Sequence, residues 1–327
     1  MNRGVQILKG IAALMVFLSH ALNMRDIAWV LKYQPTLFHI LWDGQCAVII
    51  FMGISVFFYY KTEFTWVGYF NGIKKKVLRI YPLAIIVLSL AYVLCNLQIP
   101  YNQGSFSDWG NSFWNKPIGI ADYLKNVSLL LPCNSDLLDP PIWYLYVEVR
   151  MFLIMPLLIG LWIKKGIWLS SLIILLVCVN PILPTYIEYL PVYFIGGFFR
   201  WLNEKYLNRW RAEYFWLFCI FGVVLLDINN IVGYENNVIY RIVQAFGAAF
   251  IVVGLYNIVF KQNLLCKLLE KMGNVSYEFF LLHFVVLLSF RILCLPTWLY
   301  IMLSLATSIL LSYLLNISLS RIIRIKK

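Results

Sequence analysis

Charged residues are scarce in this 327-residue chain: they make up 13% of the sequence, against roughly 25% in a soluble globular domain. Hydrophobic residues account for 62%, and the mean hydropathy is +0.78. This shortage of charge excludes an ordinary soluble domain. A series of apolar runs of roughly 20 residues instead predicts a helical protein that crosses a membrane several times.

The sequence also lacks the patterns that predict disulfides, metal sites or duplicated halves. Its seven cysteines form no C-x-x-C pair and lie mostly in or beside apolar runs, as expected of small packing residues. We therefore expect no metal site and no bound cofactor. The absence of an internal repeat argues against transporter folds built from duplicated halves. The first apolar run is too long for a cleavable signal, and it contains Lys9 and His20.

We predict an all-α integral membrane protein, a bundle of about ten transmembrane helices. One membrane domain is expected to fill residues 1–327, with no appended soluble domain. The expected spans are residues 5–24, 43–60, 77–97, 142–163, 166–180, 187–202, 214–228, 238–260, 275–294 and 298–319.

The distribution of basic residues predicts that both termini are cytoplasmic. With this orientation, 20 of the 27 lysines and arginines lie in inner segments and four lie in outer segments. This bias follows the positive-inside rule and accounts for the net charge of +12 without a nucleic-acid partner. The longest outer loop, residues 98–141, contains Trp109, Trp114 and the amphipathic stretch "IADYLKNVSLLL". Such a loop serves either as a lid or acceptor-binding surface, or as a helix that rests on the bilayer.

Polar residues inside spans are costly and usually face the interior of a bundle. Lys9 and His20 lie eleven residues apart on one helix face, with an axial separation of roughly 16 Å. The fourth span opens with "PPIWYLYVEVRMF", which predicts that Glu148 lies at the depth of His20. We expect these two side chains to form a hydrogen-bonded pair suited to general-base catalysis, with Tyr144 on the same face as Glu148.

Basic residues gather where the third span begins, in "KKKVLRIYP". Lys75, Lys76 and Arg79 have helical spacing on the inner side and could bind phosphates. His283 lies within the ninth span, in "GNVSYEFFLLHF". Each residue also has a simpler interpretation: His20 and His283 as structural histidines, the lysines as topology charges, and Glu148 as the partner of an arginine.

Five segments together resemble the acyltransferase 3 family of multi-span membrane proteins. "LKGIAALMVFLSHA" is similar to a first-span motif in which ten residues separate a basic residue from a histidine, here Lys9 and His20. The family usually has arginine at the first position. "GQCAVIIFMGISVFF", "KKKVLRIYP", "IWYLYVEVRMFLIMP" and "VSYEFFLLH" resemble its later motifs in the same order, from about residue 3 to about residue 320.

The resemblance implies a multi-pass protein of the bacterial cytoplasmic (inner) membrane, surrounded by membrane lipids. It would transfer an acyl group, usually acetyl, from cytoplasmic acyl-CoA to a hydroxyl of a cell-surface polysaccharide or its lipid-linked precursor. The implied roles are His20 as general base, Glu148 as its orienting group, Arg79, Lys75 and Lys76 as phosphate ligands, Lys9 at the thioester end, and Trp143, Tyr144, Tyr277 and His283 as chamber-lining residues. Direct transfer and an acyl-enzyme relay both remain open. The alternatives are a transporter or flippase of a glycan or lipid precursor, and a non-catalytic membrane component.

Overall fold

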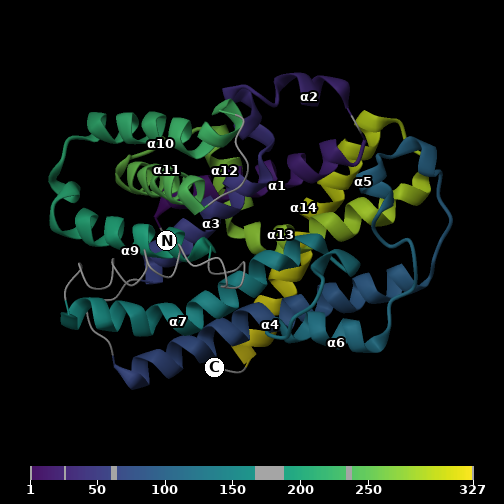
Figure 1. Cartoon of the computed structure of the whole chain (residues 1–327), viewed down its shortest axis with the longest axis horizontal. Coiled ribbons are helices and arrows are strands. Elements are labelled where there is room, and N and C mark those ends of the chain that lie inside the picture. The colour runs from purple at the N-terminus through teal and green to yellow at the C-terminus, as the bar shows by residue number, and fades with distance from the viewer. Residues whose placement is uncertain (1, 26, 60–64, 166–187, 233–237, 326–327) are drawn as a thin grey trace.

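The computed structural model describes all residues except 1, 26, 60–64, 166–187, 233–237 and 326–327, and within these limits it contains helices and no strand (Figure 1). The long helices are α1 (Arg3–Asn23), α3 (Gly44–Tyr59), α4 (Trp66–Asn96), α7 (Trp143–Lys165), α9 (Leu190–Lys205), α10 (Ala212–Val232), α11 (Val238–Asn257), α13 (Ser276–Ser289) and α14 (Thr297–Ile325). The shorter helices are α2 (Ala28–Tyr33), α5 (Asp108–Asn111), α6 (Ile120–Ser128) and α12 (Leu264–Asn274), with 3-10 turns η1 (Leu37–Trp42), η2 (Gln103–Ser105), η3 (Ser135–Leu137), η4 (Pro140–Ile142), η6 (Leu207–Arg209) and η7 (Phe290–Leu293).

Nine of the ten predicted spans coincide with long helices, and the segment 166–180 lies outside the described residues. Within the described part of the chain, six helical stretches are long and apolar enough to cross a membrane: Arg3–Asn23, Trp66–Asn96, Pro140–Leu158, Ile239–Asn257, Ser276–Leu293 and Thr297–Ser320. Gly44–Phe58 is a shorter apolar helix. The chain is therefore a multi-pass helical membrane protein, while a total of ten spans and cytoplasmic termini stay predictions.

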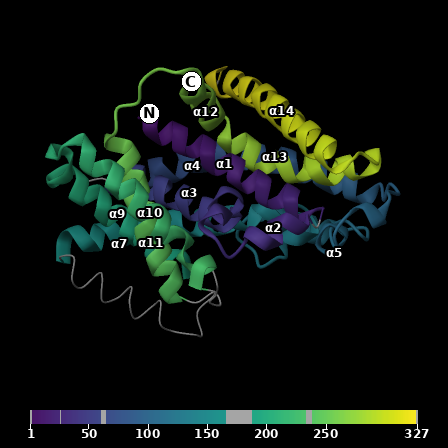
Figure 2. The same ribbon diagram turned by 90° about the horizontal axis from the view of Figure 1, so that it is seen from above.

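Helix α1 lies in the middle of the bundle and contacts α3, α11, α12, α13 and α14. Its side chains join two hydrophobic cores. Leu8 and Ala12 belong to the core shared with α3 and α11, whereas Ala13, Phe17 and Ala21 belong to the core shared with α13 and α14. In Figure 2, α13 and α14 lie side by side along one face, and α9, α10 and α11 form a group at one end. Residues on α1 are therefore held from several sides.

The long loop of residues 98–141 is held onto the helix ends by two arginines. Arg291 Nη1 donates hydrogen bonds to the Tyr101 hydroxyl (2.8 Å) and to the carbonyl oxygens of Gly110 (2.8 Å) and Phe113 (3.1 Å). Arg25 Nη1 donates to the carbonyl oxygen of Ser105 at 2.8 Å. The amphipathic stretch predicted in this loop includes helix α6. The loop is thus an ordered cover whose backbone is bonded to charged side chains.

Helix α12 was not predicted, and it packs against α1 at very short range. A methyl group on Gly273 would lie on the carbonyl oxygen of Gln6, and one on Gly10 would lie on that of Leu269. Backbones can approach this closely only where both helices present glycine, as at small-residue helix interfaces in membranes. Together with the Gln6–Asn274 side-chain hydrogen bond of 2.8 Å, this contact fixes the N-terminal half of α1.

Gly273→Ala is expected to destabilise the protein by about 1–3 kcal/mol, because the added methyl group forces α12 away from α1. Thermal unfolding of the purified protein, followed by tryptophan fluorescence, measures the effect. Gly119→Ala is the control, since a methyl group there meets no atom within 4 Å. Equal unfolding temperatures for the two variants would show that the α1–α12 contact is not close in solution.

Candidate active site

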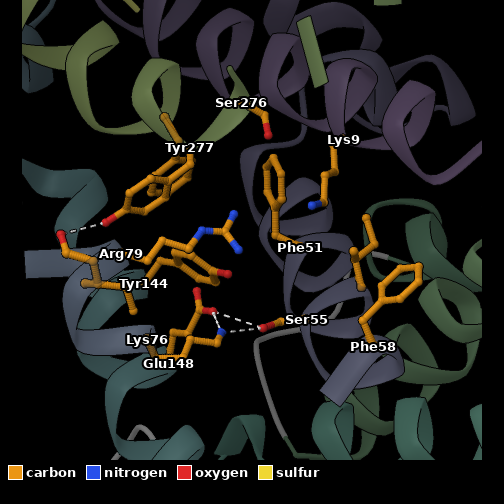
Figure 3. A pocket seen from close by; sticks show the side chains of 13 residues that line it. Lys9, Phe51, Ser55, Phe58, Lys76, Arg79, Tyr144, Glu148, Ser276 and Tyr277 are labelled. Carbon is orange, nitrogen blue, oxygen red and sulfur yellow. Dashed lines mark hydrogen bonds and ion pairs between the residues drawn. The ribbon is translucent and has the colours of Figure 1, made fainter. Parts of the chain in front are cut away.

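A polar cavity of about 270 Å³ lies among α1, α3, α4, α7 and α13 (Figure 3). It is lined by Lys9, Phe51, Ile54, Ser55, Phe58, Lys76, Arg79, Ile80, Tyr144, Glu148, Ser276, Tyr277 and Phe280. Three of these residues are cationic and one is acidic, which is unusual inside an apolar bundle. Intramembrane ionisable residues of this kind mark functional sites by default.

Glu148 occupies one wall of the cavity and is bonded there by two other helices. Its carboxylate oxygen Oε1 lies 2.6 Å from Lys76 Nζ of α4 and accepts a hydrogen bond from Ser55 Oγ of α3 at 2.9 Å. Lys76 also donates to Ser55 at 3.2 Å, so the three side chains form a closed triangle. Glu148 is only 8% exposed, and this pairing compensates for the removal of its charge from water.

Lys9 and Arg79 point their charged ends into the cavity from opposite sides (Figure 3). The Arg79 guanidinium lies 5.8 Å from the ring centre of Tyr277, whose hydroxyl donates to the carbonyl oxygen of Ile80 at 3.0 Å. Lys9, Arg79, Ser276 and Tyr277 also line a second cavity of about 240 Å³, together with polar groups that include Asn274 and Glu278. The two cavities therefore share a cationic wall.

A second polar centre lies further along α1. His20 Nδ1 is 2.8 Å from His283 Nε2 of α13, and the two imidazole rings are stacked with an interplanar angle of 7°. His283 Nδ1 lies 3.1 Å from the carbonyl oxygen of Phe279. A carbonyl oxygen only accepts, so Nδ1 of His283 carries the proton and its Nε2 accepts from His20 Nδ1. This arrangement leaves the Nε2 lone pair of neutral His20 available as a base.

Aromatic rings surround the histidine pair and separate it from the cavity. His20 is stacked near Trp109 of the long loop 98–141, with ring centres 6.0 Å apart, and touches Phe284 edge-on at 4.9 Å. Phe280 lines the cavity, and its ring centre lies 6.1 Å from that of His283. The pair therefore lies between this loop and the cationic cavity.

The predicted bond between His20 and Glu148 is wrong. Glu148 instead bonds Lys76 and Ser55 and lines the same cavity as Lys9. Lys9 precedes His20 by eleven residues of α1, a rise of about 16 Å. The prediction assumed that the fourth span starts at the membrane surface. In the structure, α7 is preceded by the buried turn Pro140–Ile142, so its first residues already lie inside the bundle.

The other predicted residues divide into three groups. Lys9, Lys76, Arg79, Tyr144 and Tyr277 line the cavity as expected of site residues, although their roles stay predictions. His283 was expected in the inner half of the chamber and instead binds His20. Lys75 is exposed, and Trp143 packs on Tyr189 with ring centres 5.4 Å apart; neither belongs to the cavity wall.

Sequence reasoning missed Ser55 as a member of the site. The residue stands alone as a hydroxyl in the apolar run of α3, and that isolation was the available signal. Phe51 and Phe280 were also missed, because phenylalanines are so frequent in this chain that their positions carry little information.

The fold and the paired polar centres define a helical membrane protein with an internal active-site-like cavity. The chain belongs to the acyltransferase 3 family: the family model, described as an acyltransferase domain, matches residues 2–317. It is accordingly a membrane acyltransferase. Searches among proteins of curated function and among solved structures gave no significant match.

Lys76→Met is expected to lower the stability by about 3 kcal/mol, because it leaves the buried Glu148 carboxylate without its ion-pair partner. Lys75→Met, on the exposed neighbour, is expected to change it by less than about 0.5 kcal/mol. The double variant Lys76→Met/Glu148→Met should recover most of the loss, because it removes both charges. Thermal unfolding measures all three; a Lys76→Met variant as stable as Lys75→Met would contradict the triangle.

Proposed function

We propose that the protein transfers an acyl group, acetyl by default, from cytoplasmic acyl-CoA to a hydroxyl of a cell-surface polysaccharide or its lipid-linked precursor. The setting is the cytoplasmic membrane of a bacterium. The observation that carries the proposal is the His20–His283 pair. Its hydrogen bonds leave the Nε2 atom of His20 unprotonated, so that this atom can act as a base. A cationic cavity lies on the same helix and suits an anionic donor.

In this proposal His20 is the general base. Its Nε2 takes the proton of the acceptor hydroxyl while the hydroxyl oxygen attacks the thioester carbonyl carbon. The carbon–sulfur bond breaks, and the proton on His20 passes to the departing CoA thiolate, so that the enzyme returns to its starting state. His283 accepts the hydrogen bond from His20 Nδ1 and stabilises the imidazolium that forms in between. Glu148 has no part in orienting His20, which revises the role expected from the sequence.

The donor phosphates fit the wall that the two cavities share. Lys76 is engaged by Glu148 and Ser55, and Lys75 lines neither cavity. Arg79 lines both cavities and is the cation best placed for a phosphate group. Its guanidinium can bind two phosphate oxygens at once. Lys9 of α1 lines the same cavities and is placed for the pantetheine or thioester end. Trp109, beside His20 and 38% exposed, offers a flat apolar face of the kind on which a sugar ring packs.

Inside-out vesicles that enclose crude glycan and receive radiolabelled acetyl-CoA from outside test the proposal. We expect wild type to label the glycan and His20→Ala to lower the rate by at least about 100-fold, the usual range for loss of a general base. His283→Asn, whose side-chain oxygen still accepts from His20, should retain more activity than His283→Leu. Full activity of His20→Ala would refute the assignment. Movement of glycan without any label would instead favour the transporter.

Arg79→Ala is expected to raise the KM for acetyl-CoA about tenfold or more with a smaller change in kcat, because it removes a charged contact to the donor. Steady-state transfer rates over a range of acetyl-CoA concentrations separate the two constants. Lys75→Ala is the matched control, since it removes a positive charge four residues away that does not face the cavity. A KM shift of the same size in both variants would indicate surface charge and not a phosphate site.

A further inference from the structure

A cluster of three ionisable side chains lies apart from the cavity and the histidine pair. His39 in η1 and Asp43, which ends η1, are four residues apart, and Asp227 comes from α10. His39 Nδ1 lies 3.6 Å from Asp43 Oδ2 and 4.0 Å from Asp227 Oδ1. All three potential ligand atoms lie within 4.8 Å of one another. The fold thus brings together residues separated by more than half of the chain.

The two aspartates of the cluster are buried, and two polar atoms of the cluster have no hydrogen-bond partner. Asp227 is 0% exposed, and its Oδ2 has no hydrogen-bond partner; the same is true of His39 Nδ1. Both distances to His39 are too long for hydrogen bonds. Within the described residues, no lysine or arginine forms an ion pair with Asp43 or Asp227. Two buried carboxylates without a cation are costly, and a bound metal ion is one of the few groups that remove this cost.

Neighbouring groups orient the carboxylates as outer partners do around metal ligands. The Asn230 amide donates to Asp43 Oδ2 at 2.8 Å and to Asp227 Oδ1 at 2.6 Å. The Cys46 backbone N–H donates to Asp43 Oδ1 at 2.9 Å. The Cys46 thiol also donates to Asp43 Oδ2 at 3.1 Å. Asp227 Oδ2 has no partner and Asp43 Oδ1 accepts one bond, so each carboxylate keeps an oxygen that can still bind an ion.

An ion can reach the cluster from a cavity of about 240 Å³. His39 and Asp43 line this cavity, and so do Ser19 and Asn23 of α1, which flank His20. Helix α10 packs against η1, so Asp227 of α10 lies next to His39 and Asp43, which line this cavity. The cluster therefore has an access route as well as ligands.

We propose that His39, Asp43 and Asp227 bind a divalent transition-metal ion, with Zn²⁺ as the best-matched occupant. One imidazole nitrogen and two carboxylates suit zinc, whereas Mg²⁺ and Ca²⁺ prefer oxygen ligands alone. Ligands about 2.0–2.2 Å from a tetrahedral zinc ion are about 3.4 Å apart. The separations in the cluster, which are at most 4.8 Å, therefore need to shrink by less than about 1.5 Å. The ion fastens η1 and the start of α3 to α10, beside the part of α1 that holds His20. It takes no part in acyl transfer.

Metal content of the full-length protein tests the proposal directly. The protein is purified in detergent without a polyhistidine tag, treated with a chelator, exposed to ZnCl₂ and passed through a desalting column. Elemental analysis should then find about one zinc ion per chain, and the unfolding temperature should rise by several degrees. His39→Ala and Asp227→Asn should each weaken zinc binding about tenfold or more. Asp122→Asn is the control, because Asp122 is exposed and pairs with Lys125 away from the cluster.

The remaining outcomes overturn the proposal. Zinc below about 0.1 per chain in wild type, with no thermal shift, would show that the cluster binds no metal. Zinc retained equally by His39→Ala and Asp227→Asn would place the metal elsewhere. Displacement of zinc by equimolar Ca²⁺ would refute the transition-metal assignment. If both variants fail to fold, Co²⁺ added to wild type decides the question: visible absorption bands of a tetrahedral site support it, and their absence refutes it.

Discussion

The ion pair between Lys76 and Glu148 is the interaction on which the geometry of the cavity depends. A carboxylate in an apolar bundle has no bulk water to bind, so it has to be satisfied by fixed groups. Lys76 comes from α4 and Ser55 from α3, so the bonds to the Glu148 carboxylate of α7 join three helices at a single point. Glu148 also neutralises one of the three cations in the cavity. The net positive charge that remains is carried by Lys9 and Arg79, the two residues that also face the second cavity.

The buried turn before α7 explains why Glu148 meets Lys76 and not His20. Pro140, Pro141 and Ile142 are all buried, and the chain enters α7 from within the bundle. A proline pair at this place costs no hydrogen bonds, since the first backbone N–H groups of a helix have no partner inside it. The helix therefore begins inside the bundle, and Glu148 is only five residues from its start.

Hydropathy predicted the long helices well, because burial in lipid imposes a strong and local constraint on composition. Period alone also placed Lys9 and His20 on one face of α1, since a helix fixes that relation by itself. The helical period does not, however, predict which residues of different helices pair. Whether His20 meets Glu148 or His283 depends on where α7 and α13 begin relative to α1, and those offsets arise from the turn Pro140–Ile142 and from the Gly10–Gly273 contact. Likewise, no spacing in the sequence relates Asp227 to His39, because only the packing of α10 on η1 brings them together.

Under the proposed function, the acyl-CoA has to reach from the cationic cavity at Lys9 to the histidine pair at His20. The phosphates of an acyl-CoA are too costly to carry through an apolar bundle, whereas its pantetheine arm is long and only weakly polar. Arg79 would therefore retain the phosphates and Lys9 would contact the pantetheine arm, while the thioester extends past Phe51 and Phe280 to His20. Those rings and Trp109 keep the thioester away from bulk water at the point of reaction, which favours attack by a bound hydroxyl over hydrolysis. The separation of roughly 16 Å between the centres is then the feature that lets a donor from one side of the membrane meet an acceptor from the other.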